Sequence, residues 1–255
     1  MHPYLLIGGL KLPVYWLMSL LGLALAAFLL RQRNRFYQLP GDDVLHIGIL
    51  AMVGALIGAK LLYLLTILPE LITYAGLWLA EPMLLLSGGA VFYGGLYGGL
   101  TAALLYCRKY RVDKARAVAL FTPAIPLFHA CGRLGCFFSG CCWGVPWERG
   151  LAYQEALAAP NGVPLLPVQL ISAALLLLLF VFLLLAETRL SQKHLLLPLY
   201  LALYSVGRFI LEFFRGDTLR GIFLLSTSQW IAAATLCGLV VWWFFRRSKG
   251  GNGHE

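Results

Sequence analysis

The chain has 255 residues, of which 60% are hydrophobic and only 12% are charged, and it carries a net charge of +9. Soluble globular domains contain about 25% charged residues, so this composition excludes an ordinary soluble protein and indicates a polytopic membrane protein. We therefore expect an all-α fold with a single transmembrane domain over residues 1–246, followed by a short polar cytoplasmic tail at 247–255.

Seven apolar runs are long enough to cross a bilayer as helices, which takes roughly 20 residues each. In chain order they cover residues 12–30, 44–68, 84–106, 117–138, 168–187, 195–214 and 228–245. The first run lacks the basic segment that precedes the apolar part of a cleaved signal peptide. We expect this run to remain in the membrane as the first span.

Basic residues concentrate in alternate connections between these runs. Thirteen of the 20 Lys and Arg residues follow the first, third, fifth and seventh runs. Because basic residues accumulate on the cytoplasmic side, seven spans place the N-terminus outside and the C-terminus in the cytoplasm. The positive charge then faces the headgroups of membrane lipids. This distribution argues against nucleic acid as a partner.

The third run is rich in glycine. Its segment Gly94–Gly99 contains glycines four residues apart, a spacing that lets two helix backbones approach closely. For Gly88 and Gly89 we favour a backbone turn that approaches a lipid phosphate. Tyr93 fits two interpretations equally, as a hydroxyl donor in the same pocket or as a tyrosine of the membrane interface.

The stretch 131–144, at the end of the fourth run, combines Arg133 with four glycines and four of the six cysteines. A charged side chain at membrane depth is costly and normally has a functional role. The sixth run carries Arg208, Glu212 and Arg215, whose spacing places them on one helix face. An ion pair that only joins helices would explain these three residues, but arginines also suit bidentate binding of a phosphate diester. Under the predicted orientation all of these groups lie towards the outer leaflet.

These motifs together resemble the signature of the bacterial prolipoprotein diacylglyceryl transferases. The resemblance rests on Gly132-Arg133-Leu134-Gly135 with Gly140 and Trp143-Gly144, on the helix from Arg208 to Arg215, and on the glycine-rich third run. Tyr15 in the first run and Pro167-Val168-Gln169-Leu170 before the fifth also match, so the resemblance runs nearly end to end.

The resemblance implies seven spans, a site open to the outer leaflet of the bacterial inner membrane, and no cofactor or metal. It implies an enzyme of lipoprotein biosynthesis that moves diacylglyceryl from phosphatidylglycerol to a cysteine thiol of a prolipoprotein, with glycerol-1-phosphate leaving. Arg133 and Arg208 would then stabilise the charge that develops on the phosphate. The catalytic residues we expect are Arg133, Arg208, Glu212, Tyr15, Cys136 and Cys141. The substrate-binding residues we expect are Gly88, Gly89, Tyr93, Gly94, Gly132, Gly144, Gln169 and Arg215.

The chain departs from the family pattern where the acceptor would be handled. Cys136 stands in place of an asparagine, Cys141 in place of a glutamate and Tyr93 in place of a histidine, and the loop 143–166 is short. The cysteines fit a disulfide such as Cys136 with Cys141 or Cys142, or a thiol activated by Arg133. A metal site lacks a standard ligand spacing here, and simple packing is a further interpretation.

Two alternatives to the transferase follow from these departures. The first is a diverged enzyme that keeps phosphatidylglycerol as donor and uses another acceptor. The second is a membrane protein on the same scaffold that binds lipid or exchanges thiols without transferring diacylglyceryl. We expect Cys136 or Cys141 to matter for function, either as a reactive thiolate or in a disulfide that shapes the loop.

Overall fold

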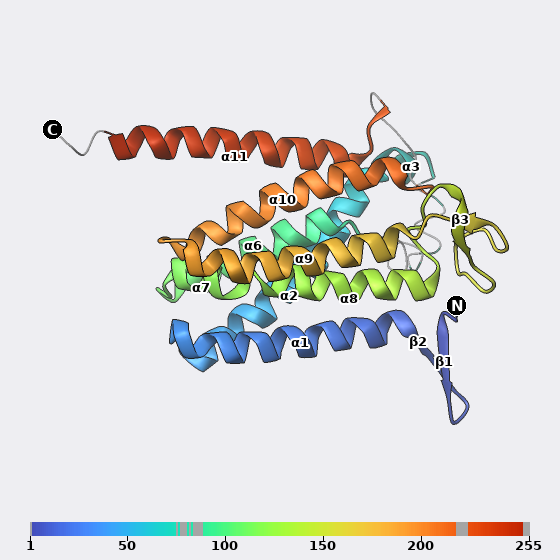
Figure 1. Cartoon of the computed structure of the whole chain (residues 1–255), viewed down its shortest axis with the longest axis horizontal. Helices are drawn as coiled ribbons and strands as arrows, with labels where there is room; N and C mark the ends of the chain where they lie inside the picture. The colour runs from blue at the N-terminus through green and yellow to red at the C-terminus, as the bar shows by residue number, and fades with distance from the viewer. Residues whose placement is uncertain are drawn as a thin grey trace. The chain divides into compact units, whose positions relative to one another are not determined.

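The computed structural model describes residues 2–74, 76, 81, 83, 89–217 and 224–251, most of which form α-helices (Figure 1). Among these residues, six helical segments are long and apolar enough to cross a membrane: Val14–Tyr37, Gly41–Thr66, Lys114–Ser139, Val168–Arg189, Lys193–Phe214 and Thr227–Arg247. The prediction of an all-α, multi-pass membrane protein is confirmed.

These segments coincide with six of the seven predicted runs. The third run, 84–106, falls on helix α6 (Phe92–Lys109), whose glycines, tyrosines and terminal Arg108 and Lys109 make it less apolar than the six. Residues 84–88 lie outside the described part of the chain. Helix α1 (Val14–Tyr37) ends beyond its predicted apolar run, because a helix continues through the basic residues that flank it.

The contacts divide the chain into two compact units. Unit 1 consists of Met1–Tyr37 and Val118–Glu255, and unit 2 of Gln38–Ala117. The described elements of unit 2 are α2 (Gly41–Thr66), α3 (Leu68–Thr73) and α6, and α7 (Lys114–Phe121) crosses the boundary between the units. Asp113 caps α7, since its Oδ1 accepts hydrogen bonds from the N–H groups of Ala115 and Arg116.

In unit 2, helices α2 and α6 approach each other at glycines. A Cβ placed on Gly58 would lie 2.3 Å from the carbonyl oxygen of Gly94, and one on Gly98 would lie 2.3 Å from that of Gly54. No side chain fits at such distances, so glycine is required there. The predicted close approach of helix backbones at Gly94–Gly99 is confirmed.

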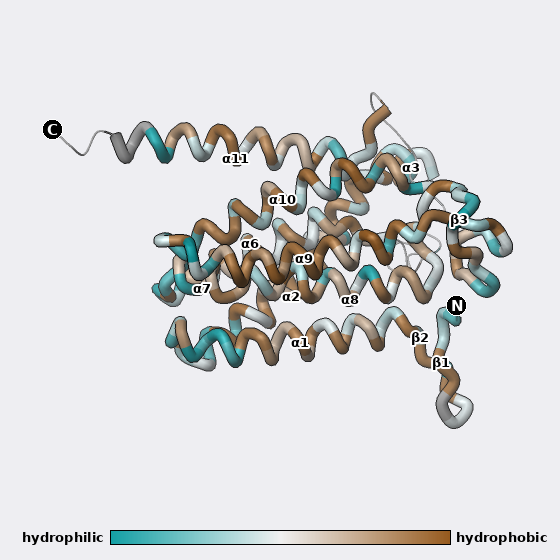
Figure 2. The backbone as a smooth tube through the Cα atoms, viewed as in Figure 1, coloured by the Kyte–Doolittle hydropathy of each residue, from teal (hydrophilic) through white to brown (hydrophobic). Residues whose placement is uncertain are grey.

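Unit 1 is a bundle in which α8 (Ala124–Ser139) packs against α1 and α9 (Val168–Arg189), while α10 (Leu196–Leu211) packs against α9 and α11 (Thr227–Gly251). Figure 2 shows α9 as an almost continuously hydrophobic helix, as expected for a lipid-facing span. Short 3₁₀ helices flank α10, η1 (Lys193–Leu195) before it and η2 (Glu212–Phe214) after it.

One end of unit 1 carries basic residues. Arg189 and Lys193 lie there between α9 and α10, and Arg246 of α11 contacts Gln192 and His194 next to them. Arg33 of α1 is buried and pairs with Glu187 of α9, and its Nη2 donates to the carbonyl oxygen of Ala119 at 2.9 Å. Arg33 is therefore held by protein groups inside the bundle.

The opposite end of unit 1 carries two small antiparallel sheets. Strands β1 (Tyr4–Ile7) and β2 (Leu10–Pro13) form a hairpin before α1, and β3 (Pro146–Ala152) pairs with β4 (Pro164–Leu165) between α8 and α9. Both lie at the same end in Figure 1, where His2 contacts Glu155 at 2.8 Å. The chain between α8 and β3 carries the cysteine-rich motif, so this end positions the candidate site.

Candidate active site

Helix α8 holds Arg133 inside unit 1, with 8% of the residue exposed. Among the described residues its Nε, which is fully buried, has no hydrogen-bond partner. A buried guanidinium normally satisfies its N–H groups with carboxylates, carbonyls or a bound anion. The Nε of Arg133 is therefore a buried donor that a bound anion could satisfy.

Helix α10 presents a buried polar stripe that continues into η2. Tyr200, Tyr204, Arg208 and Glu212 follow one another at four-residue spacing, and each is less than 9% exposed. The rings of Tyr200 and Tyr204 stack with their centroids 5.7 Å apart. The ring of Tyr204 also lies 5.6 Å from that of His129 on α8, so the stripe faces α8.

Glu212 joins two arginines at the end of this stripe. Its Oε2 lies 2.7 Å from Nη2 of Arg208 and 3.5 Å from Nη1 of Arg215. Arg215 also binds Asp217 in a bidentate manner, at 2.9 and 2.8 Å. Ser228 of α11 accepts a hydrogen bond from Nη2 of Arg208 at 3.2 Å.

Arg133 lies close enough to these groups to interact electrostatically with Tyr204, Arg208 and Arg215. The five residues Arg133, Arg208, Arg215, Glu212 and Asp217 are called the arginine cluster below. Three guanidinium groups against two carboxylates give it one surplus positive charge. Since a buried charge is costly unless it is balanced, this cluster favours the binding of a single anionic group.

Arg215 lies just beyond the sixth span. Burial alone would lower its pKa, but the hydrogen bonds to Asp217 and the nearby Glu212 raise the pKa above its ordinary value. Arg215 is therefore charged at every physiological pH, and its guanidinium is held in a fixed orientation by the two bonds to Asp217.

The cysteine-rich motif turns back over the end of α8. Gly140 ends the helix in the left-handed conformation with φ of 67°, and the backbone N–H of Cys141 then bonds to the carbonyl of Cys136 at 3.1 Å. Cys142 also has a left-handed backbone, with φ of 58°, which is strained for a residue with a Cβ. The turn brings the Sγ atoms of Cys136, Cys141 and Cys142 within 4.8 Å of one another. These three residues are called the thiol cluster.

The thiols of Cys141 and Cys142, beyond the end of the fourth span, have opposite acidities. Hydrogen bonds from the thiols of Cys136 and Cys141 lower the pKa of Cys142, and the charges of Arg133 and Arg215 act in the same direction against the effect of burial. The pKa of Cys141 is raised by its interactions with the thiols of Cys136 and Cys142 and by partial burial, and its Sγ donates to the carbonyl oxygen of Cys136 at 3.7 Å. The arginine and thiol clusters are therefore close enough to influence each other's charges.

Two further predicted residues, Tyr15 and Gln169, lie next to the thiol cluster, together with Tyr153. Tyr15 of α1 packs against Gly135, where a Cβ would lie 3.0 Å from its ring, and it interacts electrostatically with all three thiols and with Arg133. Gln169 of α9 donates from Nε2 to the carbonyl of Cys141 at 2.8 Å and to the hydroxyl of Tyr153 at 2.9 Å. Burial raises the pKa of Tyr153 to about 12.

Gly144 ties the two clusters together through the backbone. It pairs with Arg215 in an isolated bridge, and the neighbouring bonds are Val145 N–H to Phe214 O at 2.9 Å and Gly216 N–H to Trp143 O at 3.0 Å. A Cβ on Gly144 would lie 2.3 Å from the carbonyl oxygen of Leu166, so no larger residue fits. At Gly132 a Cβ would meet nothing within 4 Å, which leaves the α8 backbone open on that side.

Four predicted substrate-binding residues belong to the glycine-rich segment. Gly88 lies outside the described residues. Gly89, Tyr93 and Gly94 belong to unit 2, where Gly89 faces the ring of Tyr63 and Gly94 faces Gly58 across the α2–α6 contact. Tyr93 is only 1% exposed and stacks on Tyr97 with ring centroids 6.3 Å apart. The roles assigned to these residues stay predictions.

Four residues of the site, namely His129, Tyr204, Cys142 and Asp217, were not among the predicted site residues. His129 and Tyr204 lie four residues before Arg133 and Arg208, and this spacing, which places each pair on one helix face, is the signal that could have found them. Cys142 was considered with the other cysteines as a disulfide partner, a reactive thiol, a metal ligand or a packing residue, but was not chosen as a site residue. Its place in the cluster depends on the left-handed turn after α8, which no spacing rule reveals.

The chain is similar to known proteins over nearly its whole length. The family model for prolipoprotein diacylglyceryl transferase matches residues 3–245. A phosphatidylglycerol–prolipoprotein diacylglyceryl transferase of Clostridium tetani is 34% identical over 232 residues, 89% of this chain and 90% of its own length. A second such transferase of Clostridium perfringens is 31% identical over 96% of this chain and 94% of its own length. The transferase of Nitrosomonas europaea is 31% identical over 94% and 88% of the two chains.

Proposed function

The chain belongs to the prolipoprotein diacylglyceryl transferase family, and from this premise we propose that its arginine cluster binds the phosphate of phosphatidylglycerol during transfer. The predicted enzyme class and donor are confirmed by this membership. The protein is a membrane transferase of lipoprotein maturation, with phosphatidylglycerol as donor and a prolipoprotein as acceptor.

The observation that carries the proposal is the buried Nε of Arg133, next to a cluster with one surplus positive charge. A phosphate diester carries one negative charge and planar pairs of oxygens, which a guanidinium grips through two parallel hydrogen bonds. As the carbon–oxygen bond of the donor breaks, a second negative charge develops on the leaving glycerol phosphate. Arg133 and Arg208 stabilise this charge. Glu212 and Asp217 hold the guanidinium groups of Arg208 and Arg215 in place.

The acceptor half of the reaction needs a thiolate at the carbon that the phosphate leaves. We assign the acceptor half to the thiol cluster because Cys136 and Cys141 stand where the family pattern has asparagine and glutamate. Tyr15 lies beside both clusters and is 43% exposed, a suitable position for a group that contacts substrate. Gln169 and Gly144 act as positioning residues, since they hold the loop that carries Cys141 and Cys142.

Complementation tests this function in cells. We expect the chain to restore growth and the lipidation of a reporter lipoprotein in a bacterial strain depleted of its own transferase. A chain with Arg208→Ala, expressed to the same level, gives no rescue. If the wild-type chain fails to rescue while it still binds phosphatidylglycerol, the acceptor has changed, and a different thiol substrate replaces the prolipoprotein.

We further propose that the protein resides in the bacterial inner membrane with its N-terminus outside and the site towards the outer leaflet. The support is that the basic residues Arg189, Lys193 and Arg246 gather at one end of unit 1, whereas the Cys141–Arg215 region lies at the other. A green fluorescent protein fused after residue 255 is expected to fluoresce, because it folds in the cytoplasm. A fusion of alkaline phosphatase at the same point is inactive, and activity there would reverse the orientation.

A further inference from the structure

The thiol cluster has the ligand set of a zinc site. Zinc with thiolate ligands is tetrahedral with Zn–S distances of about 2.3 Å, which puts sulfurs about 3.8 Å apart. The three Sγ atoms lie within 4.8 Å of one another, so small side-chain rotations would seat an ion among them. All three are free thiols and only partly buried, which leaves a path for the ion.

The backbone around the cluster is built to hold these ligands. Gly140 reverses the chain so that Cys141 returns over Cys136, and the left-handed backbone of Cys142 turns its side chain to the same point. Strain of this kind persists only where surrounding contacts enforce it. Gln169 supplies such a contact by binding the carbonyl of Cys141 at 2.8 Å, as outer groups at metal sites orient the ligands.

The charges around the cluster match a trithiolate zinc centre. Three thiolates and one Zn²⁺ ion carry a net charge of −1. Arg133 and Arg215 interact electrostatically with Cys142, and Arg133 also interacts with Cys136, so positive groups lie next to a centre of that charge. Tyr15 also lies within electrostatic reach of the three thiols and adds a neutral hydroxyl.

We propose that Cys136, Cys141 and Cys142 bind a zinc ion whose fourth coordination position takes the thiol of the acceptor cysteine. The proposal rests on the proposed transferase function and assigns the acceptor half of the site. It also revises the expectation from sequence that the site uses no metal. Catalytic zinc sites commonly combine three protein ligands with one position for water or substrate, which is the arrangement that these three thiols leave.

The chemical role of the ion is to hold the acceptor as a thiolate. The acceptor thiol displaces water from the fourth position and gives its proton to solvent. The lone pair of its sulfur then forms a bond to the glycerol carbon of phosphatidylglycerol that is attached to phosphate oxygen. The carbon–oxygen bond breaks, its electron pair leaves with glycerol-1-phosphate, and the arginine cluster stabilises the added negative charge. The products are a thioether and glycerol-1-phosphate, and no oxidant is needed.

The first test is the metal content of the purified full-length protein. We expect one zinc ion per chain by mass spectrometry of the metals, and less than a tenth of this in a variant with Cys141→Ser and Cys142→Ser. After chelation and addition of Co²⁺, the wild type gains the near-ultraviolet absorption of thiolate–cobalt bonds and the variant does not. Cys237→Ser, a change of an exposed cysteine in α11, keeps both signals.

The second test connects the ion to the reaction. Removal of zinc lowers transfer to a lipobox peptide by at least about 100-fold, and added zinc restores it. Binding of phosphatidylglycerol vesicles is unchanged, because the arginine cluster is intact. Cys136→Ser lowers zinc affinity and transfer together while the protein remains folded, as judged by its circular dichroism.

Several results would overturn the proposal. Wild-type protein that holds no zinc and no cobalt is one, and a disulfide among these cysteines, seen as thiols that react with maleimide only after reduction, is another. If zinc can be removed without loss of transfer, the ion is structural, and the proposal that its fourth coordination position binds the acceptor thiol is rejected. If zinc-loaded protein shows no transfer to any thiol peptide, the proposed function fails instead, and the metal signals still report on the site.

Discussion

Replacing Arg133 by alanine is expected to lower the rate of diacylglyceryl transfer by roughly 100- to 1,000-fold, because loss of one preorganised donor to a developing anion has this effect in other enzymes. The guanidinium of Arg133 is buried, and its Nε has no partner among the described residues. Since Arg133 forms no ion pair with any residue that the structure describes, its loss is expected to remove the contact with the phosphate and to leave the described ion pairs intact. Arg208→Ala acts in the same direction.

Two further variants isolate the role of the guanidinium. Arg133→Lys keeps the charge but loses the planar pair of donors, so we expect transfer between that of the wild type and that of Arg133→Ala. Arg116→Ala removes an arginine with 58% of its side chain exposed and leaves the rate unchanged. The rate is measured with purified protein at saturating phosphatidylglycerol. Turnover of Arg133→Ala close to the wild-type value would show that the phosphate is bound elsewhere.

Replacing Glu212 by alanine is expected to destabilise the protein by about 3–5 kcal/mol, the typical cost of breaking a buried ion pair by removing one partner. Glu212 is 2% exposed and pairs with both Arg208 and Arg215, so its loss leaves the arginine cluster with a larger unbalanced charge. Thermal unfolding in detergent measures the effect, and added phosphatidylglycerol partly reverses it by supplying an anion.

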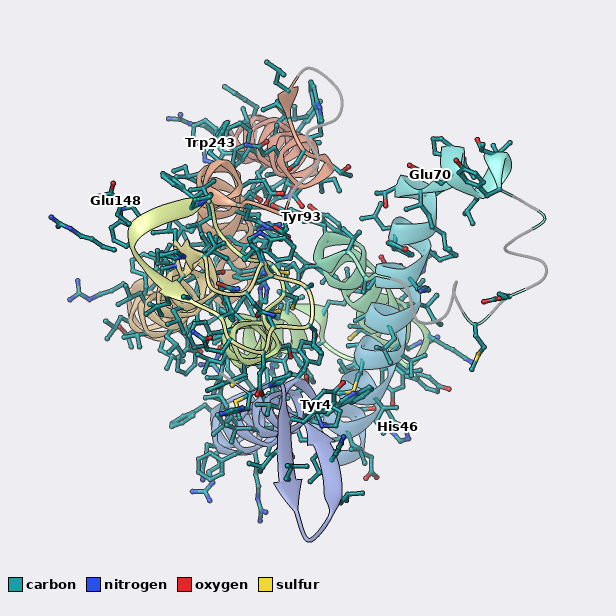
Figure 3. All side chains as sticks on the ribbon, turned by 90° about the vertical axis from the view of Figure 1, so that its right-hand side faces the viewer. Tyr4, His46, Glu70, Tyr93, Glu148 and Trp243 are labelled. Carbon is teal, nitrogen blue, oxygen red and sulfur yellow. The ribbon has the colours of Figure 1, made fainter. Side chains whose placement is uncertain are left out.

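Glu148→Ala is the matched control for this change. Glu148 lies on β3, is exposed, and points away from the helices (Figure 3). A carboxylate at such a position contributes little to stability. If Glu212→Ala unfolds at the same temperature as Glu148→Ala, then Glu212 does not hold the arginine cluster together.

The sequence predicted the spans well because their signal is local. An apolar run of spanning length can satisfy its backbone in lipid only as a helix, so Val168–Arg189 could be assigned from composition alone. Helix α6 shows the limit of this rule, since its glycines serve the contact with α2 at the expense of hydropathy. Composition therefore predicts α6 less well than the other spans, because its sequence is suited to packing against α2.

Part of the site could be predicted and part could not. Arg133 and the Arg208–Arg215 face were found because charge in an apolar run is rare. That these two faces lie against each other could not be predicted, because it depends on contacts between segments distant in the sequence, such as the His129–Tyr204 ring pair and the Gly144–Arg215 bridge. A metal site at these cysteines was considered but not favoured, because Cys136 and Cys141 have no standard metal spacing. Their proximity arises from the left-handed turn at Gly140 and Cys142.

The central claim is that this chain transfers diacylglyceryl from phosphatidylglycerol to a thiol at the joined arginine and thiol clusters. The most direct measurement combines purified protein, phosphatidylglycerol and a lipobox peptide, and follows the peptide by mass spectrometry. We predict a peptide that carries one diacylglyceryl group on its cysteine sulfur, released glycerol-1-phosphate in equal amount, and neither product with Arg133→Ala. An unmodified peptide in the presence of bound phosphatidylglycerol, or equal product from the wild type and Arg133→Ala, would contradict the claim.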